Sequence, residues 1–142
     1  MTAKEYLRQA YRLDHRINSK IEQVEVLNSL ATKATMTVRG MPKKPNTAID
    51  TMSAVIAKIV DLQTEINADI DRLVDLKRDI IKKIKCVENL DYRTLLEKRY
   101  LNFETWEQIA VDMGYSIRQV YRVKQNAILE ISKQLKDVTK CQ

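Results

Sequence analysis

A long run of apolar residues at helical spacing dominates the middle of this sequence. From Met52 to Val87, ten steps of three or four residues cover 35 positions, so the mean spacing is 3.5 residues. That period is typical of a left-handed coiled coil, in which a second helix covers the apolar seam. We therefore predict one helix over about residues 46–87, which needs a partner because propensity alone does not stabilise so long a helix. The seam comprises Met52, Val55, Ile59, Leu62, Ile66, Ile70, Leu73, Leu76, Ile80, Ile84 and Val87.

The partner is predicted in the first 35 residues, where a weaker apolar stripe has the same spacing. Thr2 is a plausible N-cap, with Glu5 completing a capping box. The stripe comprises Tyr6, Ala10, Leu13, Ile17, Ile21, Val24, Leu27 and Ala31. Between the two helices, the stretch TMTVRGMPKKPN predicts a loop at about residues 36–46. Residues 1–88 are thus expected to form a long antiparallel coiled-coil hairpin.

The hairpin is expected to need a further partner. Ile56, Val60, Val74 and Ile81 lie beside the seam of the second helix and widen its apolar surface. One weak partner helix would leave part of that surface exposed, which favours a homodimer or packing on the C-terminal helices. The sequence does not decide whether the coiled coil pairs within one chain or between two chains.

The rest of the chain, residues 89–142, is predicted to form a compact helical head. With only 2 Gly and 2 Pro in 142 residues, the sequence lacks the turns of a strand-rich fold, so the fold class is all-α. Asp91 is expected to cap a short helix from Tyr92 to about Leu101. Further helices are predicted over about residues 105–113 and 116–135.

The stretch TWEQIAVDMGYSIRQVYRVKQ, residues 105–125, predicts two helices joined by a tight turn. Thr105 and Ser116 are candidate N-caps, each followed three residues later by a Gln that can complete a capping box. Gly114 lies between them, where the first helix has to end in a left-handed conformation. Ala110 allows close approach of the helices. Apolar packing is expected from Trp106, Ile109, Met113, Val120 and Val123.

The opposite face of the second helix carries residue types that suit DNA. Arginine can contact guanine O6 and N7 together, and glutamine can pair with adenine. From Tyr115 to the C-terminus six basic residues face two acidic ones, whereas residues 48–79 hold four against seven, so a polyanion would meet the C-terminal part. The predicted DNA-binding residues are Ser116, Ile117, Arg118, Gln119, Tyr121, Arg122 and Gln125.

The motif also resembles a known family. LLEKRYLNFETWEQIAVDMGYSIRQVYRVKQNAI, within about residues 91–135, is similar to region four of sigma factors, and more closely to phage-encoded sigma-like regulators such as the ArpU-like late-transcription proteins. The resemblance implies promoter binding through the helix beginning at Ser116, with Ile117, Arg118, Tyr121 and Arg122 on the base-reading face. Ile117 and Tyr121 replace the basic residues usual in primary sigma factors, so the usual promoter sequence is not carried over. No promoter-melting region is recognisable, which implies an accessory regulator.

Two alternatives use the same features. In one, the head docks on RNA polymerase and has little DNA affinity of its own. In the other, the protein is a small-terminase-like subunit of phage DNA packaging, a class that combines a helix-turn-helix with long coiled helices and forms rings larger than a dimer. Polymerase capture and oligomer size separate these alternatives from a DNA-binding regulator.

Other chemistry is not indicated. Cys86 and Cys141 form no CxxC and His15 is the only histidine, so no zinc set is expected, and the thiols are expected to be reduced. Asp69, Asp71, Asp75 and Asp79 do not share one helix face and are expected to be solvated. We find no nucleophile beside a base and no phosphate-cradling glycine loop, so neither an enzyme nor a cofactor is predicted. Without a signal peptide or membrane span, a cytoplasmic location is expected.

Overall fold

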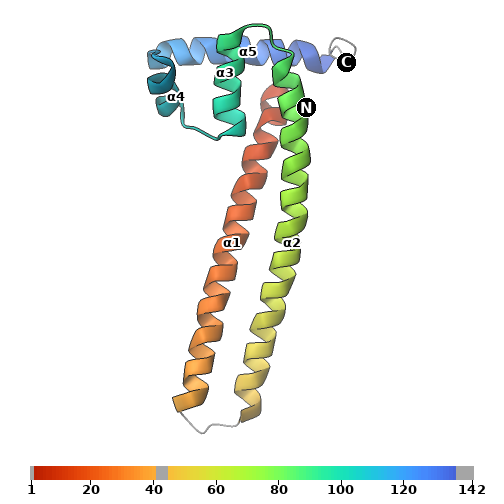
Figure 1. The fold of residues 1–142 in the computed structure, drawn as a ribbon, viewed down its shortest axis with the longest axis vertical. Coiled ribbons are helices and arrows are strands. Elements are labelled where there is room, and N and C mark those ends of the chain that lie inside the picture. Colours follow the sequence, from red (N-terminus) through yellow and green to blue (C-terminus); the bar gives the residue numbers. More distant parts are fainter. Residues whose placement is uncertain (1, 41–44, 137–142) are drawn as a thin grey trace. The chain divides into compact units, whose positions relative to one another are not determined.

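The structure, a computed structural model, describes the backbone of residues 2–40 and 45–136, and side chains over residues 2–33 and 50–136. This part of the chain is helical and contains no strand, which confirms the all-α prediction. Two long helices, α1 (Ala3–Gly40) and α2 (Pro45–Lys85), are followed by α3 (Leu90–Leu96), a π-helical turn η1 (Glu97–Leu101), α4 (Trp106–Met113) and α5 (Ile117–Lys136) (Figure 1).

The long helices extend beyond their predicted ends. Gly40 still belongs to α1, and Pro45 is the first residue of α2, a position where its missing N–H costs no hydrogen bond. The predicted loop at residues 36–46 is therefore too long at both ends, and its central residues 41–44 lie outside the described part. At the start of α1, Thr2 and Glu5 form the predicted capping box through reciprocal bonds of 3.0 and 3.2 Å.

The chain divides into two compact units. One, here called the head unit, combines residues 1–13 with residues 73–142, and the other, the arm unit, comprises residues 14–72. The first 13 residues belong to the head unit because Tyr6, Leu7 and Ala10 are buried in its core. The sequence predicts two domains that meet at residue 88 and fold independently. That division stays a prediction.

The head unit has two clusters of buried side chains. The larger joins the first turns of α1 to the last turns of α2, and includes Leu96, Tyr100 and, from α5, Ala127 and Ile131. Tyr6 donates a hydrogen bond to Asp79 beside this cluster, so Asp79 is not merely solvated as predicted. The smaller cluster, formed by Leu95, Ile109, Ala110 and Val120, holds α3, α4 and α5 together. The larger cluster comprises Ala3, Tyr6, Leu7, Ala10, Ile80, Ile84, Val87, Leu96, Tyr100, Ala127 and Ile131.

Within the arm unit, α1 and α2 run side by side in opposite directions (Figure 1). Ile17 and Ile66 are buried between them, as the apolar spacing predicts. Three predictions are wrong here, and two of them concern α2: Ile70 is 40% exposed, and Asp69 is 5% exposed instead of solvated. Asp69 occupies the inner position because Lys20 of α1 donates to its carboxylate over 2.6 Å. Ile21, also predicted in the stripe, is 40% exposed.

One further prediction, at the start of α3, is wrong. Asn89 caps α3, because its side-chain oxygen accepts from the amides of Asp91 and Tyr92 over 2.9 and 3.3 Å, so Asp91 is not the cap. Cys86 lies just after α2, and the state of the thiols stays a prediction. Cys141 lies outside the described residues.

Candidate nucleic-acid interface

The turn between α4 and α5 has the local structure that its sequence predicts. Gly114 ends α4 with φ 69°, the left-handed region that glycine enters without steric cost, and its N–H bonds back into α4. At the start of α5, Ser116 and Gln119 form a reciprocal capping box with distances of 3.1 and 3.2 Å. At the start of α4, the backbone N–H of Gln108 donates to the Thr105 hydroxyl over 3.2 Å. The Gln108 side chain donates to Asp112 and not back to Thr105, so this capping box is only half formed.

The packing of α4 on α5 uses the apolar residues expected from the sequence. Ile109 and Val120 are fully buried, and Ala110 is 6% exposed at the point of close approach. Trp106, Met113 and Val123 pack against this cluster as partly buried residues, together with Tyr115. This packing fixes one face of α5 inward, so the opposite face points to solvent.

That outward face carries the residues predicted to bind DNA. Ile117 and Tyr121 are 42% and 45% exposed. Among the described residues, neither Arg118 nor Arg122 forms an ion pair, and no acidic residue occurs between Asp112 and Glu130. We call this set the α5 face, and all of its members are exposed: Ser116, Ile117, Arg118, Gln119, Tyr121, Arg122 and Gln125.

Beside the α5 face, Trp106 lies between cations and a second aromatic ring. Its ring centroid is 6.2 Å from that of Tyr121. The Arg99 guanidinium lies 4.6 Å and the Lys124 ammonium 4.7 Å from the Trp106 ring, and Lys124 also lies 5.6 Å from the ring of Tyr121. Such cation–π contacts hold the cations without neutralising their charge.

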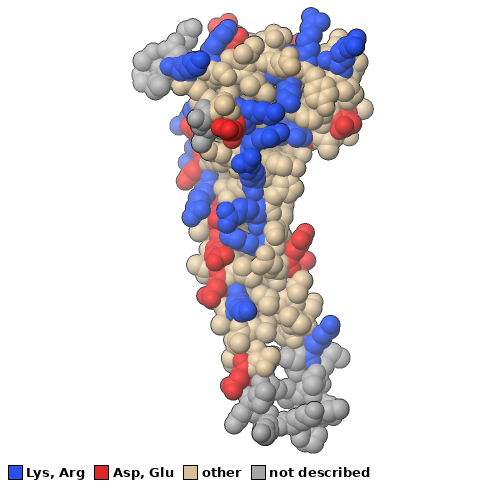
Figure 2. Space-filling model, turned by 180° about the vertical axis from the view of Figure 1, so that it is seen from behind, with Lys and Arg blue, Asp and Glu red and all other residues tan. Residues whose placement is uncertain are grey.

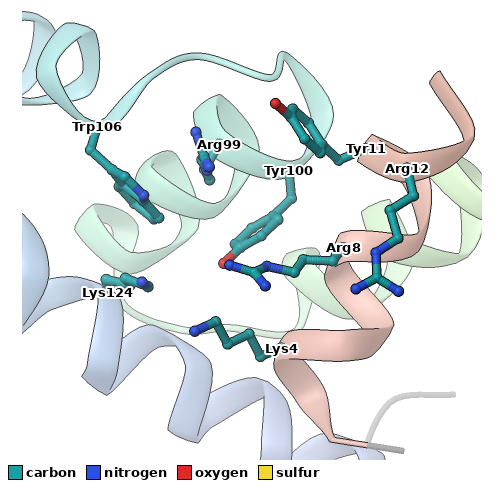
Figure 3. Close-up of a pocket in the computed structure, with 8 residues that line it drawn as sticks. All are labelled: Lys4, Arg8, Tyr11, Arg12, Arg99, Tyr100, Trp106 and Lys124. Carbon is teal, nitrogen blue, oxygen red and sulfur yellow. The ribbon is translucent and has the colours of Figure 1, made fainter. Parts of the chain in front are cut away.

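These residues border a pocket in the head unit that the sequence did not predict. The pocket has a volume of about 170 Å³ and is lined by five cations, three aromatic residues and no carboxylate. Figure 3 draws its cations around a common space: three from α1, Arg99 from η1 and Lys124 from α5. We call it the basic pocket, and its lining residues are Lys4, Arg8, Tyr11, Arg12, Arg99, Tyr100, Trp106 and Lys124.

The charges of the basic pocket act on one another. The pKa of Lys124 is lowered, first by burial and then by repulsion from Lys4, Arg8 and Arg99. The pKa of Tyr100 is raised, because burial outweighs the opposing effect of Arg99 and Arg8, so its hydroxyl stays protonated at neutral pH. Within the head unit, Figure 2 shows several Lys and Arg side chains on the face in view.

Over the described side chains, no group of three or more His, Cys, Asp or Glu residues is arranged to hold a metal ion. None of the described helices is both long and apolar enough to cross a membrane.

Comparison with known proteins identifies the family. Residues 29–132, from the end of α1 to the last turns of α5, match the model of the family described as "Protein of unknown function (DUF1492)". The chain belongs to this family. No curated protein and no solved structure matches it significantly. The matched region of this DUF1492 protein contains the α4–α5 pair and the whole α5 face.

Proposed function

We propose that this DUF1492 protein is a sequence-specific DNA-binding transcription regulator of phage or prophage type. In this proposal α4 and α5 act as a helix-turn-helix, and α5 enters the major groove from its Ser116 end. The observation that carries the proposal is the α5 face, where two arginines and two glutamines stand exposed on a helix whose first turns lack acidic residues. The resemblance of this segment to region four of sigma factors supports the same function.

The two arginines are proposed to combine phosphate and base contacts. Affinity for any duplex then comes first from phosphate neutralisation and falls steeply with salt. Sequence preference comes from Arg118, Arg122 and Gln125, whose side chains suit the edges of guanine and adenine. Tyr121, 45% exposed between them, supplies an apolar ring for a thymine methyl group.

The first test is selection of bound duplexes from a randomised pool at near-physiological salt, followed by affinity measurements on the selected site. Arg122→Ala is expected to cost about 1–3 kcal/mol on that site and much less on a random duplex. The matched control is Arg78→Ala on α2, which removes an arginine with a 67% exposed side chain outside the α5 face. An unenriched pool, with RNA polymerase captured equally by wild type and an Arg118→Ala/Arg122→Ala variant, would instead identify a polymerase-binding module.

We further propose that the protein works as a homodimer through α2. Ile56, Val60 and Ile70 are 49%, 53% and 40% exposed, and helical spacing puts all three on one flank of the helix. A two-fold dimer buries such a flank against its own copy. A ring larger than a dimer would point instead to the packaging-subunit alternative.

A further inference from the structure

We propose that the basic pocket binds a multiply charged phosphate-type anion, at a site separate from the α5 face. The proposal does not depend on sequence-specific DNA binding, because its residues are not those of the α5 face. It rests on an unbalanced cluster of charge, on groups already held in position, and on a concave space of fitting size.

The charge cluster has no internal counter-ion. Among the described residues, none of the five cations of the basic pocket forms an ion pair with a carboxylate. The groups that act on Lys124 are themselves cations. Holding like charges close together costs free energy that an anion bound between them would recover. The ligand therefore carries at least two negative charges.

Two donors of the basic pocket are fixed before any ligand arrives. The Arg99 guanidinium donates to the carbonyl oxygen of Glu104 over 2.9 Å and lies against the rings of Trp106 and Tyr11. The Glu104 carboxylate is directed elsewhere, 3.8 Å from the ammonium of Lys98. Tyr100 is only 4% exposed and keeps its hydroxyl proton as a neutral donor. Both residues belong to the π-helical turn η1, a local distortion often found at functional sites.

Size and residue type narrow the ligand to a phosphate. With a volume of about 170 Å³, against about 30 Å³ for one water molecule, the pocket admits a phosphate or diphosphate group. Arg8 and Arg12 extend from α1 on the side opposite Trp106 (Figure 3), so an anion in the space between meets donors from several directions. Guanidinium groups suit phosphate oxygens because they can donate two parallel hydrogen bonds.

Such a phosphate can come from two sources. One is a free small molecule, for example a nucleotide or oligophosphate acting as an effector. The other is the backbone of a bound duplex, since Lys124 lies on α5 and Trp106 is the first residue of α4. Each backbone phosphate carries one negative charge, so two neighbouring phosphates of a duplex would supply the two charges. The experiment tests each source separately.

Trp106 is the only tryptophan in the chain and lines the basic pocket, so its fluorescence reports on this part of the head unit. The full-length protein is titrated with sodium tripolyphosphate, against sodium chloride of matched ionic strength. We expect a saturable change with tripolyphosphate only, and about tenfold weaker binding in Arg8→Glu. Arg118→Ala, on the α5 face, is the control and should bind tripolyphosphate like wild type. Arg8 is exposed, so the variant should fold, which thermal melting checks, and Arg8→Gln serves if it does not.

The second arm titrates a random-sequence duplex. If tripolyphosphate does not bind but Arg8→Glu lowers duplex affinity more than Arg78→Glu, which makes the same change of charge, the pocket binds neighbouring backbone phosphates. The proposal is overturned if tripolyphosphate gives no saturable signal and the two charge reversals affect duplex binding equally. A loss of specific DNA binding in Arg118→Ala, with tripolyphosphate binding intact, tests the proposed function separately.

Discussion

Gly114 is the residue on which the α4–α5 turn depends. Its φ of 69° lies where residues with a Cβ are strained, yet a Cβ built there meets no atom within 4 Å. Gly114→Ala should therefore destabilise the fold by about 1 kcal/mol through backbone strain and not through a clash. Urea unfolding measures the difference in unfolding free energy between the variant and wild type. Gly114→Asn should lose less stability than Gly114→Ala, because asparagine tolerates this conformation. Equal stability of wild type and the alanine variant would mean that the turn relaxes.

Single residues were predicted well where the interaction is local. Ser116 and Gln119 are three residues apart, and the capping box that this spacing predicts is formed. Gln108 has the same spacing from Thr105, but Asp112 one turn further on takes its side-chain amide over 2.8 Å. The Asn89 cap was missed because Asn89 and Asp91 are both good caps and the choice depends on where α2 ends.

At the scale of helices, the pair of Lys20 and Asp69 joins α1 to α2 in the arm unit. Their side chains are 16% and 7% exposed, and Arg72 lies 3.7 Å from the same carboxylate. Lys20→Met should destabilise the protein by about 1–2 kcal/mol at pH 7, because a largely buried carboxylate loses its main partner and Arg72 compensates in part. Lys58→Met, an exposed lysine of the same unit, removes the same charge and should be close to neutral.

The pH dependence of that variant supplies a further check. The pKa of Asp69 is lowered from its ordinary value of 3.8, first by the hydrogen bond from Lys20. A lowered pKa gives stability that is present above the ordinary pKa and is lost as the pH falls through the folded value. In Lys20→Met the ionised Asp69 contributes less to stability. The difference in unfolding free energy between wild type and Lys20→Met should therefore become smaller below about pH 4. A gap unchanged between pH 7 and pH 3 would show that the pair acts by packing alone.

The helices themselves follow from apolar spacing, but the choice of inner position does not. Ile66 and Leu73 are one heptad apart, and either position 69 or position 70 can face α1 between them. The apolar pattern favours Ile70, whereas the structure buries Asp69. Asp69 is buried because Lys20 of α1, 49 residues earlier in the sequence, donates to its carboxylate. Which of the two positions faces α1 therefore depends on the packing of the two helices and not on the apolar pattern of α2 alone.

At the scale of the whole molecule, the basic pocket was the feature least accessible from sequence. Its cations come from the start of α1, from η1 and from α5, and each looks like an ordinary surface charge when read alone. Their convergence depends on the packing of residues 3–10 beneath the C-terminal helices. The α5 face, in contrast, belongs to one helix and one turn, and its exposure could be predicted from helical periodicity.

The exposed apolar flank of α2 leads to a prediction about assembly. Val60 is 53% exposed, and Ile56 one turn before it is 49% exposed, a pairing that costs free energy in water unless a partner covers it. If a second copy is that partner, sedimentation velocity at micromolar concentration should give a dimer for wild type. Val60→Lys should weaken it by at least about tenfold, because burial of an unpaired ammonium opposes association. Ala68→Lys adds the same charge at an exposed position of α2 outside the flank of Ile56, Val60 and Ile70, and should leave the dimer intact. Monomers throughout this concentration range would leave α5 to bind a single half-site, and the DNA selected in the randomised pool would then lack two-fold symmetry.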